Sequence, residues 1–508
     1  MILKSKLWIC TKLSLNFFSQ YILIMSCDKR MTFEECELAI LRAAIDKAEE
    51  KQGKKKLHST EIINIINIVE DFLKKTGRIC YGGTAINNIL PESSQFYNKE
   101  VELPDYDFFS PNPLEDAKKL ADLYYKKGFD EVEAKSGTHA GTFKVFVNFI
   151  PVADISLMVP EIYRKIKKDA INVKGILYSP PNFLRMLMYL ELSRPAGDIG
   201  RWEKVLKRLT LLNKHYPLKG NDCEFIEIQR LFDPDHKLKY GHVGKIFDIT
   251  KQTLVRQGVV FFGAMANKLF IRNLSKFRRA KMEKVPDFDV LSTDPDTTAK
   301  ILKKALNDSD IEDVKIIKRK GVGELIAPHF EVSVKGETIV FIYEPLACHS
   351  FNSISIKNNT YKIATIDTML SFYLAFIYIN RKYYDPQRII CMSQYLFKVQ
   401  AKNRLKQKGI LKRFSIDCYG DEKATKEKIM KKKSELFKKL KNKKGSKEWE
   451  FHFLKYLPAK INSKQKEEKK EKKTLKNKNK TKKKKQTKKK KRKTRKKRKT
   501  GLLKRLGF

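Results

Sequence analysis

Apolar positions along the first third of the chain alternate between helical and strand-like spacing. Helical spacing covers residues 31–75, and a short apolar run followed by two glycines occupies residues 78–86. Strand-like runs follow at 105–109 and 142–158, and an amphipathic helix is predicted between them over 114–127. Strands that alternate with a helix predict a mixed domain of helices and strands.

The second half of the chain repeats three short sequences of the first half in the same order. Residues 262–266 resemble 81–85, 286–289 resemble 104–107, and 345–350 resemble 151–156. Such a repeat predicts a duplicated supersecondary unit, with a loop insertion before the third match of the second copy. In this alignment Cys348 takes the place of Asp154.

Positive charge is concentrated at the end of the chain. The 508 residues carry a formal net charge of +49, and residues 463–508 alone hold 26 Lys or Arg against three Glu. A segment so poor in apolar residues cannot bury enough surface to fold, so we expect residues 461–508 to be disordered. The charge points to polyanionic partners, which are nucleic acid, nucleotides or anionic lipid.

Other features limit the class of protein. A hydrophobic content of 42% excludes a wholly disordered chain. No run of 18 apolar residues occurs, so we expect no membrane-spanning helix. Residues 1–25 faintly imitate a secretory signal, but polar residues interrupt the apolar stretch and no small-residue cleavage site follows. We expect residues 1–30 to be an upstream extension of the start site or a loosely attached arm.

The cysteines show no pattern of a metal site. They are scattered, without a C-x-x-C pair: Cys10, Cys27, Cys36, Cys80, Cys223, Cys348, Cys391 and Cys418. We therefore predict buried or idle thiols in a reducing compartment.

Three aspartates suggest chemistry. Asp105 and Asp107 lie two apart on a predicted strand, so their side chains project from one face, and Asp154 lies on a strand that can run alongside. Hard divalent cations prefer oxygen ligands, and such a set fits two ions about 4 Å apart. Taken alone, an Asp-x-Asp pair is more often a solvated edge or turn.

The glycine turn before these strands fits a phosphate site. Gly82 and Gly83 let the backbone approach phosphates, the following helix directs N–H groups at them, and Thr84 offers a hydroxyl. Two glycines after a strand are by themselves usually a tight turn. The turn and the three aspartates in this order favour a catalytic site in which divalent cations and a phosphate group bind side by side.

This arrangement resembles the nucleotidyltransferase superfamily to which DNA polymerase beta belongs. More narrowly, residues 31 to about 450 resemble the poly(A) polymerase catalytic subunits of large DNA viruses, giant viruses above all. The superfamily resemblance rests on residues 80–87, 104–109 and 151–155, and the viral one also on 189–198, 201–205 and 414–420.

The resemblance implies an α+β fold with two tandem nucleotidyltransferase-like mixed-sheet domains and helical insertions. The first domain is expected to be active and the second degenerate, because Ala264, Met265 and Cys348 replace Gly83, Thr84 and Asp154. Asp287 and Asp289 are then structural relics. The predicted division is 1–30 extension, 31–75 helical segment, 76–250 catalytic domain, 251–460 degenerate domain and 461–508 basic tail.

The implied activity is polyadenylation, in which an RNA 3′-hydroxyl attacks the α-phosphate of ATP. Two Mg²⁺ or Mn²⁺ ions are expected on Asp105, Asp107 and Asp154, with the triphosphate on Gly82, Gly83 and Thr84. Arg201 and Lys204 either contact the β- and γ-phosphates or belong to an ordinary solvated basic face.

Several alternatives remain open at this point. The chain could be a CCA-adding, uridylyl-adding or oligonucleotide-synthesising relative, a non-catalytic RNA-binding or processivity subunit, or a basic chromatin-like protein defined by its tail. The expected partners are an RNA 3′ end and ATP, with a homodimer or a processivity partner and no membrane. The expected location is the host cytoplasm (a viral factory) or the virion, with the nucleus left open by the basic tail.

Overall fold

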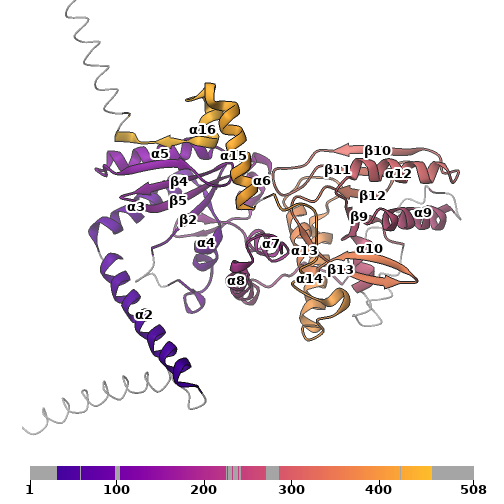
Figure 1. Cartoon of the computed structure of the whole chain (residues 1–508), viewed down its shortest axis with the longest axis horizontal. Helices are drawn as coiled ribbons and strands as arrows, with labels where there is room; N and C mark the ends of the chain where they lie inside the picture. Colours follow the sequence, from indigo (N-terminus) through magenta and orange to yellow (C-terminus); the bar gives the residue numbers. More distant parts are fainter. Residues whose placement is uncertain are drawn as a thin grey trace, which may run out of the picture.

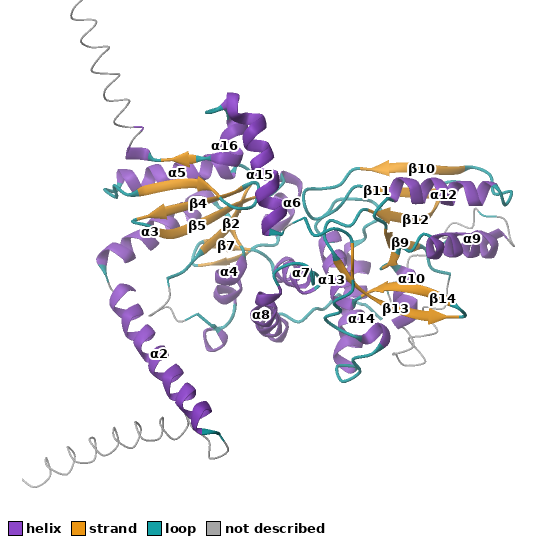
Figure 2. Ribbon diagram, in the orientation of Figure 1, coloured by secondary structure: helices purple, strands orange, loops and turns teal. Residues whose placement is uncertain are grey.

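The computed structural model describes residues 31–57, 59–97, 103–224, 226, 232, 238, 242–270, 285–423, 425–459 and 461. These residues form two mixed sheets of eight strands each, flanked by helices (Figures 1 and 2). The predicted α+β class with two tandem mixed sheets is confirmed. Residues 1–30 and nearly all of the predicted tail lie outside the described residues. Among the helices described, none has the length and apolar character needed to cross a membrane.

The first unit is built on the first sheet. In sheet order its strands are β16 (Lys455–Tyr456), β3 (Val132–Ser136), β4 (Thr142–Val147), β5 (Ile150–Leu157), β2 (Tyr106–Ser110), β1 (Ile79–Cys80), β7 (Ile176–Tyr178) and β6 (Ile171–Val173). Its helices are α2 (Phe33–Leu57), α3 (Thr60–Thr76), α4 (Gly82–Ile89), α5 (Pro113–Lys126), α6 (Pro160–Lys168), α7 (Pro181–Leu192) and α8 (Trp202–His215).

Local sequence signals explain where these elements begin and end. The hydroxyl of Ser59 accepts a hydrogen bond from the backbone N–H of Ile62 and caps α3 at its start. Gly77 ends α3 in the left-handed conformation, with φ of 57°. The strand-like run predicted at 142–158 is a hairpin of β4 and β5, because Asn148 and Phe149 adopt positive φ at its turn.

The second unit is built on the second sheet. In sheet order its strands are β10 (Val314–Arg319), β11 (His329–Val334), β12 (Glu337–Tyr343), β9 (Phe288–Leu291), β8 (Val260–Phe261), β14 (Asn359–Ala364), β13 (His349–Ile356) and β15 (Cys418–Tyr419). Its helices are α9 (His242–Arg256), α10 (Ala264–Phe270), α12 (Pro295–Asn307), α13 (Ile366–Phe376) and α14 (Pro386–Lys402).

The two sheets share one strand order, which confirms the predicted duplication. The order β3–β4–β5–β2–β1–β7–β6 of the first sheet corresponds to β10–β11–β12–β9–β8–β14–β13 of the second. In the first sheet the parallel pair β2 and β5 aligns Asp107 with Asp154. The equivalent pair, β9 and β12, aligns Asp289 with Phe341. Phe341 is therefore the counterpart of Asp154.

The predicted equivalence of Cys348 with Asp154 is wrong. Cys348 lies beyond the end of β12, in the connection to β13. The connection between β10 and β11 spans residues 320–328, whereas residues 137–141 join β3 to β4. The second unit therefore has a few extra residues in this connection, fewer than the match of Cys348 with Asp154 required. The residue that matches Asp154 thus lies earlier in the chain, at Phe341.

Helices from the two units meet between the sheets. Helix α7 packs against α13, and these helices follow the equivalent strands β7 and β14 (Figure 1). The backbone N–H of Ser350 donates to the carbonyl of Ser193 at 2.8 Å. The guanidinium of Arg194 donates to the carboxylate of Glu422, whose side chain is 3% exposed. These bonds join the loop after α7 to the second sheet.

The chain returns to the first unit after completing the second. Helices α15 (Lys426–Leu440) and α16 (Lys447–Phe453) lie beside the first sheet, and β16 pairs antiparallel with its edge strand β3 (Figure 2). Lys118 forms an ion pair with Glu450 at 2.7 Å, and Tyr456 donates to Asp122 at 2.8 Å. The predicted domain 251–460 therefore contains a segment that belongs, by strand pairing, to the first sheet.

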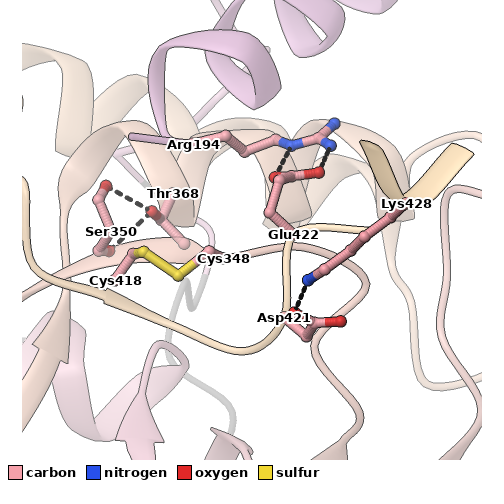
Figure 3. The surroundings of a disulfide bond; sticks show 8 residues. All are labelled: Arg194, Cys348, Ser350, Thr368, Cys418, Asp421, Glu422 and Lys428. Atoms are coloured by element: carbon pink, nitrogen blue, oxygen red, sulfur yellow. Dashed lines mark hydrogen bonds and ion pairs between the residues drawn. A yellow bond between two sulfur atoms is a disulfide. The ribbon is translucent and has the colours of Figure 1, made fainter. Parts of the chain in front are cut away.

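The prediction of idle thiols is wrong for most of the described cysteines. Cys223 is bonded to Cys391 and Cys348 to Cys418, the second of these in the surroundings that Figure 3 shows. Cys36 is also disulfide-bonded, which leaves Cys80 as the free thiol among the described residues. Spacing along the chain could not predict these bonds, because the bonded cysteines are 168 and 70 residues apart. The pairing of β13 with β15 is what brings Cys348 and Cys418 together.

Candidate active site

The three aspartates predicted as metal ligands lie on adjacent strands of the first sheet. Asp107 is in β2, and Asp105 immediately precedes that strand. The parallel pairing of β2 with β5 sets Asp154 directly beside Asp107. Paired residues on neighbouring strands project from the same face, as do residues two apart on one strand. The structure therefore brings the three predicted residues together.

Burial and mutual repulsion act on these carboxylates. Burial raises the pKa of Asp107 to about 7, and the charges of Asp105 and Asp154 contribute to the same shift. Burial, followed by the charge of Asp154, also raises the pKa of Asp105. The Oδ1 atom of Asp154 is buried and has no hydrogen-bond partner. A cation placed among these groups would relieve both the repulsion and the unsatisfied oxygen.

The donor set fits Mg²⁺ or Mn²⁺, which prefer oxygen ligands. As they stand, no three Asp, Glu, His or Cys side chains in the described part of the chain are arranged to hold a metal ion. Oδ2 of Asp154 forms an ion pair with Nζ of Lys144 instead. Sequence reasoning missed Lys144, since only the register of β4 against β5 places it opposite Asp154.

The first glycine of the turn accommodates an aspartate. Gly82 adopts φ of 74°, and a Cβ atom there would collide with the carboxylate of Asp107, whose Cγ would be 3.3 Å away. In the second unit a Cβ on Gly263 would collide in the same way with Asp289. This glycine is required by the close approach of the aspartate that follows in β2 or β9.

Thr84 does not point its hydroxyl at an open anion site. Its side chain is buried, and Oγ1 donates a hydrogen bond to the carbonyl oxygen of Asp105 at 2.6 Å. The threonine thus fixes the backbone at the start of β2, beside the carboxylates. Its contribution to the site is to position Asp105.

The second glycine accommodates an arginine. A Cβ on Gly83 would lie 2.9 Å from both terminal nitrogens of Arg208 and would collide with the hydroxyl of Tyr97. Arg208, on α8, donates to that hydroxyl at 2.6 Å, and its guanidinium carbon lies 5.1 Å from the ring centre of Phe96. A guanidinium held on aromatic rings at the start of α4 can turn toward a phosphate.

The two basic residues predicted to bind phosphate differ in their placement. Arg201 forms an ion pair with Glu191 at 3.2 Å, and its charge is among those that lower the pKa of Asp107. Lys204 is exposed on α8 and is not among the charges that act on Asp105 or Asp107. The charge of Arg201 therefore reaches Asp107, and the contacts at the glycine turn favour Arg208 over Lys204 there.

The second unit has lost part of this arrangement. Asp287 and Asp289 occupy the positions of Asp105 and Asp107, but the buried ring of Phe341 replaces Asp154. Ala264 replaces Gly83 at the start of α10. With two carboxylates and no second glycine, the second unit lacks the donor set found in the first.

Comparison with known proteins points to one family. Residues 67–198, which contain the glycine turn and all three aspartates, match the family model described as the poly(A) polymerase catalytic subunit. This segment is therefore similar to that family. The matched region ends in the loop after α7, before Arg201 and Arg208.

Relatives of the family include viral proteins named as poly(A) polymerase catalytic subunits. One from African swine fever virus is 34% identical over 207 residues, which is 40% of this chain and 43% of the relative. One from Acanthamoeba polyphaga mimivirus is 34% identical over 164 residues, 31% of this chain and 27% of the relative. The chain thus covers less than half the length of these relatives.

A solved structure shares the fold over most of the chain. The crystal structure of the Megavirus polyadenylate synthase superposes with a TM-score of 0.69 at 20% identity, covering 86% of this chain and 88% of that one. The likeness therefore extends across both units, beyond the segment that the family model matches.

Proposed function

We propose that the chain is a polynucleotide adenylyltransferase that transfers AMP from ATP to the 3′ end of RNA. The observation that carries the proposal is the alignment of Asp154 with Asp107 beside the glycine turn, inside the segment that is similar to the poly(A) polymerase family. The lost third carboxylate of the second unit supports a single active unit.

Different residues of the first unit have different proposed roles in this reaction. Asp105, Asp107 and Asp154 would hold two divalent cations, which would lower the pKa of the attacking hydroxyl and neutralise charge on the leaving group. The start of α4 holds the triphosphate, and Arg208 and Arg201 balance its β- and γ-phosphates. The RNA 3′-oxygen attacks the α-phosphorus, the bond to pyrophosphate breaks, and the hydroxyl proton leaves to solvent.

RNA is held by positive charge near the first sheet. Helix α15 carries a series of lysines, most of them exposed: Lys426, Lys428, Lys431, Lys432, Lys433, Lys438 and Lys439. Lys433 donates to the carbonyl of Gly137, which places the helix at the turn between β3 and β4. The lysine-rich residues 461–508 add to this charge. Phosphate contacts of this kind give salt-dependent binding without sequence preference.

The remaining expectations follow from the same assignment. We include in the proposal the use of ATP over other nucleotides, either self-association or a processivity partner, and location in the host cytoplasm at a viral factory or in the virion. These parts stay proposals that the reaction assay and the oligomeric state in solution will test.

The test is extension of a short labelled RNA by the full chain with Mg²⁺ or Mn²⁺ and each nucleotide in turn. We expect extension chiefly with ATP, its loss in Asp154→Asn, and its retention in Asp130→Asn, an exposed aspartate of the same unit. Predominant use of UTP or CTP would indicate another terminal nucleotidyltransferase. RNA binding without extension by any nucleotide would indicate a binding or processivity subunit.

A further inference from the structure

Lys144 forms an ion pair with one of the three aspartates. It lies in β4 and is the pairing partner of Asp154 in β5, so both side chains project from the same face of the sheet. Its Nζ forms an ion pair with Oδ2 of Asp154, while Oδ1 of the same carboxylate is buried without a partner. The side chain of Lys144 is 37% exposed and that of Asp154 is 18% exposed.

The charge of Lys144 reaches the whole carboxylate group. It is among the charges that lower the pKa of Asp105 and of Asp107, against the larger effect of burial. Arg201 is the other cation that acts on Asp107, and Glu191 already pairs with it. Lys144 therefore neutralises part of the negative charge that a divalent cation would neutralise.

The second unit supports a link between this lysine and the aspartates. Glu331 in β11 is the pairing partner of Phe341, so it takes the position of Lys144. Glu331 accepts hydrogen bonds from Arg319 and Thr338. The lysine and its aspartate are thus absent from the second unit together.

We propose that Lys144 is a resident counter-ion of the active site, which must release Asp154 before a divalent cation can use all three carboxylates. Lys144 then sets the affinity of the site for metal, and it acts as a positioning residue for Asp154. This inference rests on the proposed function, because the metal site belongs to it.

A lysine suits this role physically. Its ammonium group makes a single-point contact on a flexible stem, whereas arginine would grip a carboxylate through two parallel bonds. Since Lys144 is partly exposed, its ammonium can move to solvent when Asp154 is released. A lysine can therefore hold the carboxylate of Asp154 in place and still be displaced from it by a divalent cation.

The test is a direct measurement of Mn²⁺ binding to the full chain without nucleotide, by electron paramagnetic resonance or calorimetry. We expect Lys144→Met to bind Mn²⁺ about tenfold more tightly, equivalent to about 1.4 kcal/mol. We expect Lys144→Arg to bind it more weakly. Lys135→Met is the matched control, because Lys135 pairs with Lys144 across the sheet and contacts Glu133 instead.

A second comparison keeps the test decisive. In an Asp154→Asn background, replacing Lys144 by Met should change Mn²⁺ affinity less than in the unaltered chain, because the ion pair with Asp154 is gone and only the effect of the charge on Asp105 and Asp107 remains. Lys144→Gln replaces Lys144→Met if the latter does not fold. Equal or weaker Mn²⁺ binding by the neutral variant, or no Mn²⁺ binding by any form, overturns the inference. Failure of the proposed function is distinct, since it appears as an absence of RNA extension by the unaltered chain.

Discussion

The two sheets have the same strand order but differ in which matched residues they keep. Gly82 and Asp107 have direct counterparts in Gly263 and Asp289, and in each unit the glycine makes room for the aspartate. By contrast, Asp154 is matched by Phe341. The retained pair is a packing requirement of the strand–helix turn, whereas the lost carboxylate is one that we propose as a metal ligand.

The same contrast holds for the groups around these positions. Gly83, which makes room for Arg208, is matched by Ala264, and Lys144 is matched by Glu331. The second unit thus shares the glycine–aspartate contact of its fold and lacks the residues that we propose for phosphate and metal binding. Substitutions at matched positions should therefore have unequal effects in the two units.

The largest expected difference is between Asp107→Asn and Asp289→Asn. The first removes a proposed ligand of both cations, so we expect AMP transfer to fall on the order of a thousandfold, about 4 kcal/mol of transition-state stabilisation. The second should leave the rate within about twofold. Initial rates of RNA extension at saturating ATP will measure both. Similar losses in the two variants would contradict the assignment of a single active unit.

Introducing a carboxylate at the matched position of the second unit should destabilise it. Phe341→Asp removes a buried ring and places a charge beside Glu331, so we expect a loss of about 3–4 kcal/mol in the free energy of unfolding. Phe341→Leu, the control, should cost about 1–2 kcal/mol. Thermal unfolding will compare them, and a fully stable Phe341→Asp would show that this position tolerates charge.

Arg208→Met should weaken ATP binding with a smaller effect on the maximal rate. The guanidinium lies at the glycine turn, so its loss should raise KM for ATP about tenfold. Inorganic tripolyphosphate should also compete less well against the variant, whereas adenosine should compete as before. Lys207→Met is the control on the same helix, because Lys207 pairs with the exposed Glu203. An unchanged KM for ATP would contradict the proposal that Arg208 contacts the triphosphate.

The smallest effects are expected from exchanging the two residues at the second glycine position. Gly83→Ala should raise KM for ATP a few-fold, because a Cβ there displaces Arg208 and Tyr97. Ala264→Gly should leave AMP transfer unchanged and cost about 0.5–1 kcal/mol of stability, through helix α10. Steady-state kinetics and thermal unfolding of both variants will separate the two effects.

Local sequence patterns were sufficient to predict the order of elements around the site. The glycine turn, the strand with Asp105 and Asp107, and the strand with Asp154 each carry their signal within a few residues. The mixed helix-and-strand character of the first domain and the duplication followed from similarly short patterns. These predictions succeeded because each depends on spacing along the chain and on little else.

What the sequence could not provide depends on register and on distant pairing. Cys348 was matched with Asp154 because a similar short motif recurs there, while the insertion at 320–328 concealed Phe341. Lys144 has an ordinary position in an alternating strand, and only pairing with β5 places it on Asp154. The sequence does not distinguish Arg208 from the other basic residues of its helix, because only the fold shows that its guanidinium lies against Gly83.

The return of β16 to the first sheet affects the order in which the protein folds during synthesis. A ribosome emits the chain from its first residue, so β3 is made more than 300 residues before the strand that covers its edge. Until Tyr456 emerges, that edge displays unpaired backbone groups to other chains in the cell. The edge of β3 can therefore pair with other chains until the last tenth or so of the protein has been translated.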